Sequence, residues 1–247
     1  MMLRNRKDHG ARFVSNNSGI YELVCDAVLF DLDGTLVDST KVVERLWAEW
    51  AARHSLNVED ILAISHGRRA EETMRLMAPH LKNLKEEAAA RLREEEQQSE
   101  GLVAVAGAKT LLSNIPHTRW AIVTSCTRKL AEVRLGSVGL PVPAVVVSEE
   151  SVPLGKPHPD GYLEAARILG WTPRNCLVVE DSPVGVEAGR AAGMRVLGVS
   201  TTFPADRLSA DLSVADLSEV AIVPGLPLTI RIGAVPLRAP WLELNSD

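Results

Sequence analysis

The second half of the chain alternates short apolar runs with segments of helical pattern, and this alternation limits the possible folds more than any other feature. Four-residue apolar runs between helices are typical of strands buried on both faces of a parallel sheet. The pattern predicts an α/β fold with a doubly wound parallel sheet. The expected strands are Trp120–Val123, Ala144–Val147, Cys176–Val179 and Arg195–Val199. The expected helices are Ala108–Asn114, Arg128–Val138, His158–Leu169 and Pro183–Ala192.

An earlier apolar segment, Val24–Phe30, is expected to join the same sheet as its first strand. The residues between it and the next strand have helical periodicity, so residues 38–107 are expected to form a helical insertion, a cap domain. The run Glu94-Glu95-Glu96 predicts a solvated helix face there. We expect a leader at 1–22, a core at 23–37 and 108–222, and a tail at 223–247 with one edge strand.

Composition narrows the classes of function. The net charge of the 247 residues is −5 and no basic stripe is present, which argues against nucleic-acid binding. No apolar run is long enough to cross a bilayer, and the N-terminus has no apolar region typical of a secretory signal. The three cysteines fit neither a disulfide framework nor a zinc site, so we expect buried thiols in a reducing cytoplasm. We expect a cytoplasmic monomer that acts on a small molecule.

Two acidic residues, Asp31 and Asp33, directly follow the first expected strand. Carboxylates are rarely buried without a partner, and ligands of open α/β sheets bind at the carboxyl ends of strands. The pair therefore predicts a cation site, a proton relay or both. The alternative interpretation is a strand followed by an ordinary Asp-Gly turn.

Three more polar clusters follow later strands of the expected sheet. Thr124 and Ser125 come after the second strand, Lys156 lies in the loop after the third, and Glu180-Asp181 follows the fourth. All are expected at the same edge of the sheet. Several close carboxylates require a cation, and an all-oxygen ligand set suits Mg²⁺. Because lysine and hydroxyl groups bind anions, the set predicts phosphoryl transfer, for which a carboxylate can be the nucleophile.

In their order and context, these four clusters resemble the motifs of the haloacid dehalogenase superfamily of phosphotransferases. The helical insertion resembles the cap of the subfamily with an α-helical cap, and the resemblance covers residues 26–220. It implies that Asp31 is the nucleophile that accepts the phosphoryl group. It also implies that Asp33 protonates the leaving alcohol and then activates water, and that its backbone carbonyl binds Mg²⁺.

The resemblance implies roles for the other clusters as well. Thr124 would hydrogen-bond the phosphoryl oxygens with Ser125 beside it, and Lys156 would neutralise charge. Dehalogenases of this superfamily lack an acid two residues after the nucleophile, so Asp33 favours phosphate esters over carbon–halogen bonds. Glu180 would be a second or an outer-sphere metal ligand. The implied metal-binding residues are Asp31, Asp33, Asp181 and Glu180.

The cap contains the string His66-Gly67-Arg68-Arg69, which resembles that of sugar- and polyol-phosphate phosphatases, including 2-deoxyglucose-6-phosphate and glycerol phosphate phosphatases. All four residues are therefore predicted to bind substrate, although Arg68 and Arg69 could also be exposed residues at a helix start. The corresponding loop of β-phosphoglucomutases resembles Gly-x-x-Arg, and that position is Ala70 here. This favours a phosphatase. A phosphomutase and a non-catalytic binding protein on the same fold are the alternatives.

Overall fold

The computed structural model describes residues 10–11, 13–15, 20–223, 225 and 227–233. Within them, the main sheet has six parallel strands in the order β10-β9-β8-β3-β6-β7, which confirms the predicted α/β class. β3 lies between β6 and β8, so the loop that follows it opens at the middle of the sheet edge. The strands are β3 (Ala27–Phe30), β6 (Trp120–Val123), β7 (Val146–Val147), β8 (Cys176–Glu180), β9 (Arg195–Val199) and β10 (Leu212–Val214).

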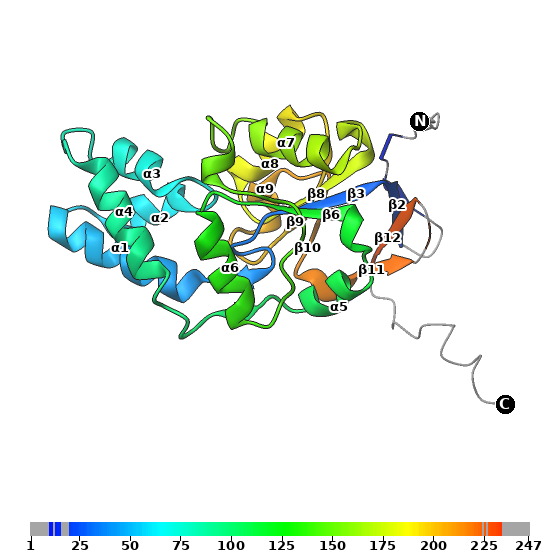
Figure 1. The fold of residues 1–247 in the computed structure, drawn as a ribbon, viewed down its shortest axis with the longest axis horizontal. Coiled ribbons are helices and arrows are strands. Elements are labelled where there is room, and N and C mark those ends of the chain that lie inside the picture. The colour runs from blue at the N-terminus through cyan, green and yellow to red at the C-terminus, as the bar shows by residue number, and fades with distance from the viewer. Residues whose placement is uncertain (1–9, 12, 16–19, 224, 226, 234–247) are drawn as a thin grey trace.

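Helices cover both faces of this sheet (Figure 1). Along β3, Val28 and Phe30 belong to one apolar core, whereas Ala27 and Leu29 belong to the core on the opposite face. A strand buried on both sides must be apolar at every position, which is why it reads as a continuous run. None of the described helices is long and apolar enough to cross a membrane. The covering helices are α5 (Ala108–Ser113), α6 (Arg128–Ser137), α7 (Asp160–Leu169), α8 (Pro183–Ala191) and the short α9 (Ala205–Leu208).

The insertion forms a helical cap at one end of the molecule (Figure 1). Its own apolar core includes Trp47, Trp50 and Met74. The two chain segments that join cap and core pair with each other as antiparallel strands β4 (Val37–Asp38) and β5 (Val103–Ala104). The cap helices are α1 (Thr40–His54), α2 (Val58–Ser65), α3 (Ala70–Met77) and α4 (Leu84–Glu95).

The prediction of one strand over Val24–Phe30 is wrong, because the chain bends at Asp26. The bend is held by Asn175, whose backbone carbonyl accepts from the Asp26 amide at 2.8 Å and whose side chain donates to the Asp26 carboxylate at 3.0 Å. The residues before the bend form a strand of a second, antiparallel sheet, in the order β1-β2-β12-β11. Its strands are β1 (Phe13–Ser15), β2 (Tyr21–Cys25), β11 (Val220–Val223) and β12 (Leu228–Ile232).

The C-terminal segment does supply a strand, but its predicted position at a sheet edge is wrong. β12 lies between β2 and β11 because it forms antiparallel hydrogen-bonded ladders with both. Its alternate residues Leu228, Ile230 and Ile232 pack into the main apolar core. Parts of the expected leader (1–22) and tail (223–247) are thus strands, and most of the remaining residues of both segments lie outside the described residues. The three cysteines are buried free thiols, as predicted.

Substitution of β12 should show whether this strand stabilises the core. We expect Ile230→Ala to lower the free energy of unfolding by about 2–5 kcal/mol, because Ile230 is 1% exposed and its loss leaves a cavity. Arg231→Ala, on the exposed face of the same strand, removes a surface ion pair with Glu22 and should cost less than about 1 kcal/mol. Urea unfolding measures both. Equal effects would contradict the internal placement of β12.

Candidate active site

The site begins at Asp31, the first residue after β3. Its backbone amide donates to the carbonyl of Val179 on the neighbouring strand at 3.0 Å, which continues the sheet up to the site. The Asp31 carboxylate forms an ion pair with the ammonium group of Lys156, and the same ammonium group lies 2.6 Å from Oε1 of Glu180. All three side chains are buried. The fold therefore brings together three charged groups that lie far apart in the sequence.

Both carboxylate oxygens of Glu180 are already engaged within the protein. Oε1 accepts from Lys156 and, at 3.0 Å, from the hydroxyl of Tyr162. Oε2 accepts from the backbone amide of Asp181 and from both the amide and the hydroxyl of Ser182, each at 3.0 Å. This arrangement fixes Glu180 and aims Lys156 at Asp31. Sequence reasoning missed Tyr162, because an aromatic residue on the apolar face of α7 is indistinguishable from ordinary core until its hydroxyl is located.

Asp181, by contrast, keeps one oxygen without a partner. Its Oδ1 accepts from the Thr35 hydroxyl at 3.3 Å, whereas its buried Oδ2 has no hydrogen-bond partner among the described residues. The loop with Gly34 passes so close that a β-carbon there would lie 2.0 Å from this oxygen, and Gly34 also has φ +83°. Only glycine fits that position without strain. The Gly34 loop therefore packs directly against Asp181 Oδ2.

The carboxylates carry more negative charge than their surroundings compensate. Oxygens of Asp31, Glu180 and Asp181 lie within 4.8 Å of one another. Burial raises the pKa of Asp31 to about 7, with Glu180 adding to the shift and Lys156 opposing it. Burial, together with Asp31 and Glu180, raises the pKa of Asp181 well above its ordinary value, and Thr202 and Lys156 oppose this shift only in part. A buried, unpartnered carboxylate oxygen within a cluster of hard oxygen donors fits a divalent cation such as Mg²⁺.

Thr124 and Ser125 follow β6 and line the cavity above Asp31. The Thr124 hydroxyl accepts from the Cys126 amide and donates to the Cys126 thiol, each at 3.2 Å. The Ser125 hydroxyl instead donates to the carbonyl of Gly67 in the cap at 2.7 Å. The two adjacent hydroxyl groups thus have different surroundings, one within the core and one at the contact between core and cap.

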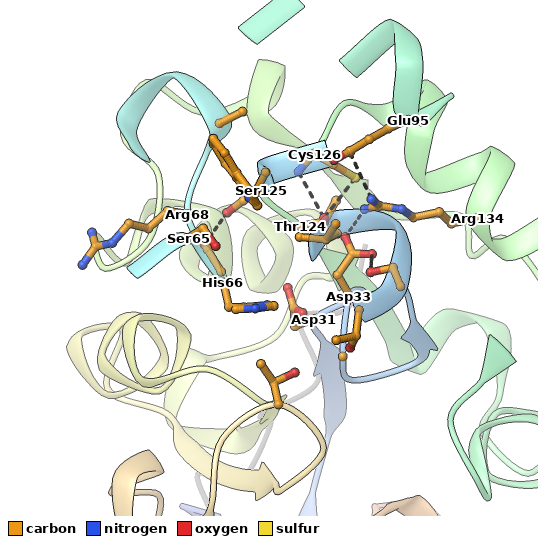
Figure 2. Close-up of a pocket in the computed structure, with 18 of the residues that line it drawn as sticks. Asp31, Asp33, Ser65, His66, Arg68, Glu95, Thr124, Ser125, Cys126 and Arg134 are labelled. Atoms are coloured by element: carbon orange, nitrogen blue, oxygen red, sulfur yellow. Dashed lines mark hydrogen bonds and ion pairs between the residues drawn. The ribbon is translucent and has the colours of Figure 1, made fainter. Parts of the chain in front are cut away.

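Asp33 lies in the same cavity, with both carboxylate oxygens bound. Oδ1 accepts from the Ser39 hydroxyl at 2.8 Å, and Oδ2 forms an ion pair with Arg134. Arg134 is bound in turn by Glu95 of the cap at 3.0 Å, as Figure 2 shows. The prediction of a solvated Glu94-Glu95-Glu96 face is therefore wrong for Glu95, which is buried.

The spacing of residues along α4 could have indicated that Glu95 is buried, although Glu95 lies within a run of three acidic residues. Ala88, Arg91 and Glu95 recur at intervals of three and four residues, and all three are buried. This spacing places them on one face of the helix, turned toward the rest of the protein. Arg134, in contrast, lies within α6 with no motif that would have pointed to it.

The cap loop places three of its four predicted substrate residues at the cavity: His66, Gly67 and Arg68. The His66 ring points toward Asp31 in Figure 2 and packs edge-on against Phe203, with ring centroids 5.8 Å apart. Burial lowers the pKa of His66, which favours its neutral form. Gly67 has φ +79°, and a β-carbon there would lie 2.3 Å from the Ser182 hydroxyl oxygen. The Arg68 side chain points away from Asp31 (Figure 2).

Arg69 is directed elsewhere. Its guanidinium donates to the backbone carbonyls of Val152 at 2.8 Å and Pro153 at 3.1 Å, in a loop of the core. These bonds hold the cap against the core beside the site. We therefore propose that Arg69 joins the cap to the core and does not bind substrate.

The cavity between cap and core has a volume of about 70 Å³. This is room for several water molecules. Its walls combine the acidic and hydroxyl groups of the core with Trp47, His66 and Arg91 of the cap. The chemistry available here is attack by a buried carboxylate on an anion held by Lys156, with a second carboxylate, Asp33, within the same cavity.

Comparisons with known proteins agree with this geometry. The family described as haloacid dehalogenase-like hydrolase matches residues 25–193. Hexitol phosphatase A of Escherichia coli (strain K12) is 43% identical over 207 residues, which cover 80% of this chain and 94% of that protein. Glycerol-1-phosphate phosphohydrolase 2 of Saccharomyces cerevisiae is 32% identical over 199 residues, covering 75% and 79%. A solved hydrolase from Pseudomonas syringae has the same fold, with a TM-score of 0.71 at 23% identity over 78% of this chain and 94% of that one.

The uncompensated charge of Asp181 predicts a stability effect. Its pKa is raised in the folded protein, so its ionisation destabilises the fold as pH rises above the ordinary aspartate range. At pH 7.5 in EDTA, we expect Asp181→Asn to raise the melting temperature, because the variant lacks the buried carboxylate charge. Each kcal/mol gained in the free energy of unfolding corresponds to a rise of about 2–4 °C. The effect should shrink toward pH 4.

The same variant tests the cation site. Added Mg²⁺ should raise the melting temperature of the unsubstituted protein, because a ligand that binds the folded state alone stabilises it. It should not raise that of Asp181→Asn. Calorimetry with and without Mg²⁺ measures both, and an equal response of the two proteins would contradict a cation ligand at Asp181.

Proposed function

Because this chain belongs to the haloacid dehalogenase-like hydrolase family and is a phosphoric monoester hydrolase, we propose that it is a Mg²⁺-dependent phosphatase of small phosphorylated sugars or polyols. The buried cluster carries the proposal: Lys156 contacts the Asp31 carboxylate, and Asp181 keeps an unpartnered oxygen beside it. An ammonium group and a cation site around one carboxylate are what nucleophilic attack on a phosphate dianion requires.

The proposed reaction has two steps. In the first, a carboxylate oxygen of Asp31 attacks phosphorus, the bond to the ester oxygen breaks, and Asp33, which enters this step protonated, gives its proton to the departing alkoxide. In the second, Asp33 takes a proton from water, the resulting hydroxide attacks phosphorus, and the bond to Asp31 breaks. Inorganic phosphate leaves and both aspartates return to their starting states. Lys156 and Thr124 would stabilise the charge on the phosphoryl oxygens during both steps.

The residues proposed to hold Mg²⁺ are the carboxylates of Asp31 and Asp181 and the backbone carbonyl of Asp33. When bound, the ion would supply neutralisation of the phosphate and carboxylate charges. Glu180 has both oxygens engaged with Lys156, Tyr162, Asp181 and Ser182. This supports an outer role for Glu180, in which it orients Lys156 rather than binding the ion directly.

The proposed substrate class rests on the relatives and on the polar walls of the cavity. The relatives include a hexitol phosphatase and a glycerol-1-phosphate phosphohydrolase. The cavity is lined by the hydroxyl group of Ser39, the guanidinium group of Arg91 and the carboxylate of Glu95. Such hydrogen-bonding groups suit an alcohol with several hydroxyl groups. The cysteine usage supports a reducing cytoplasm, and the net charge of −5 supports a protein that does not bind nucleic acid.

The phosphomutase alternative is weaker because Ala70 lines the cavity where the mutase loop carries arginine. Arg69 is occupied by carbonyls of the core, and Arg68 points away from Asp31, so neither supplies the missing cation (Figure 2). A second phosphate would therefore lack a partner in this part of the cap.

Substitution of the proposed nucleophile tests the mechanism. We expect Asp31→Asn to reduce phosphate release from a hexitol phosphate by at least about 10³-fold, since the amide cannot form the covalent intermediate. The variant should keep its melting temperature to within a few degrees. Activity within tenfold of the unsubstituted enzyme would contradict the assignment.

A panel of esters tests the proposed substrate class. With Mg²⁺ present, we expect phosphate release from hexitol phosphates, glycerol 1-phosphate and 2-deoxyglucose 6-phosphate, and loss of activity in EDTA. Nucleotides and phosphopeptides should be poor substrates, because they are larger than the sugar and polyol phosphates of the proposed class. Conversion of glucose 1-phosphate to its isomer without phosphate release would establish the mutase instead. The absence of hydrolysis across the panel would favour a binding protein.

A further inference from the structure

A chain of buried ion pairs runs from the core to the cap. Asp33 pairs with Arg134, Arg134 pairs with Glu95, and Glu95 pairs with Arg91. The side chains of Arg134, Glu95 and Arg91 are only 4–5% exposed. Removing these charges from water costs free energy, and direct pairing offsets that cost only when the geometry is good. Stabilisation of the fold is therefore a weak explanation for a buried chain of this kind. Its position at Asp33 suggests a role in the reaction.

The four groups belong to two different bodies. Asp33 and Arg134 are in the core, Arg134 on α6, whereas Glu95 is the last residue of α4 in the cap. Arg91 lies one turn earlier on α4, with its guanidinium 4.1 Å from the ring centroid of Trp47 on α1. Arg91 and Trp47 thus hold Glu95 within the cap.

Arg134 is held by one carboxylate from each body. Burial by itself would lower the pKa of the guanidinium, but Asp33 and Glu95 outweigh it and raise the pKa above its ordinary value. Arg134 therefore stays charged, and it must remain beside at least one of the two acids. Because Nη1 binds Asp33 and Nη2 binds Glu95, the direction of one bond limits the direction of the other (Figure 2).

We propose that Glu95 is a positioning residue for the acid–base group: acting through Arg134, it ties the orientation of the Asp33 carboxylate to the position of the cap. When the cap places Glu95 against Arg134, the guanidinium is shared and Asp33 is oriented by Arg134 and Ser39 together. When Glu95 is withdrawn, Arg134 binds Asp33 alone and pulls it from that orientation. The inference rests on the proposed function, in which Asp33 protonates the leaving alcohol.

The test uses the dependence of the reaction on its leaving group. An alkoxide leaving group needs a proton, whereas 4-nitrophenolate leaves without one. The constant kcat/KM reports events only up to the first irreversible step, so the later activation of water does not contribute to it. The ratio of kcat/KM for glycerol 1-phosphate to kcat/KM for 4-nitrophenyl phosphate therefore measures leaving-group protonation by the holoenzyme.

The chain offers a matched control one residue away. Glu96 also joins the end of α4 to α6, through an ion pair with Lys129, but that pair is at the surface, with Lys129 74% exposed. Glu96→Gln removes a cap-to-core ion pair without touching the partner of Asp33. Glu95→Gln removes the buried pair and preserves the size of the side chain. Asp33→Asn supplies the reference for complete loss of the acid, and melting temperatures verify that each variant folds.

We expect Asp33→Asn to lower the ratio by about 10²-fold or more, Glu95→Gln by about 10-fold, and Glu96→Gln by less than about 2-fold. If Glu95→Gln does not fold, Glu95→Asp and Arg134→Lys replace it, and the same drop in the ratio is expected. Equal losses on both esters, or an unchanged ratio, would overturn the positioning role while leaving the proposed function intact. A ratio unaffected by Asp33→Asn would instead refute the acid assignment itself.

Discussion

The imbalance of charge around Asp31 is the constraint on which the site depends. Three carboxylates converge at the end of β3 and β8, and Lys156 is the cation that directly contacts two of them. Burial makes this arrangement costly, as the raised pKa of Asp31 and that of Asp181 show. The surrounding fold maintains it because Glu180 is fully hydrogen-bonded and the Gly34 loop passes against Asp181. Such a site favours ligands that bring positive charge, such as Mg²⁺, or that pair with Lys156, such as phosphate.

The cap completes this site through polar contacts and a few apolar ones, among them Leu92 and His66, while its own apolar core stays separate. Ser125 donates to Gly67, Arg69 binds carbonyls of the core, and Glu95 binds Arg134. The apolar core of the cap is separate from the two cores of the sheet. Polar contacts between separately packed bodies are exchanged at little net cost, because water replaces them. This arrangement suits a cap that admits substrate and then closes over it.

Sequence patterns predicted the structure most accurately where a single physical cause, such as burial on both faces of a sheet, determined the local conformation. The strands Trp120–Val123 and Arg195–Val199 were predicted with their observed bounds. All their residues except the exposed Arg195 at the start of β9 are buried, and burial on both faces excludes polar side chains. Patterns failed where two causes overlapped. The apolar run from Val24 continues across Asp26, although hydrogen bonds to Asn175 divide it into strands of two sheets. Those bonds join residues about 150 positions apart, which no local pattern can reveal.

The fold class and the four polar clusters can be predicted from the residues alone, because each cluster follows an apolar strand and the carboxyl ends of parallel strands meet. The way in which those groups share their hydrogen bonds and ion pairs is visible only in the folded chain. In the folded protein both carboxylate oxygens of Glu180 accept hydrogen bonds, whereas one oxygen of Asp181 has no hydrogen-bond partner. Arg69 binds carbonyls of the core, and Glu95 is buried beside Arg134. Residue type and spacing specify which groups can interact. Which partners they take depends on distances between segments that are remote in the chain, and packing alone sets those distances.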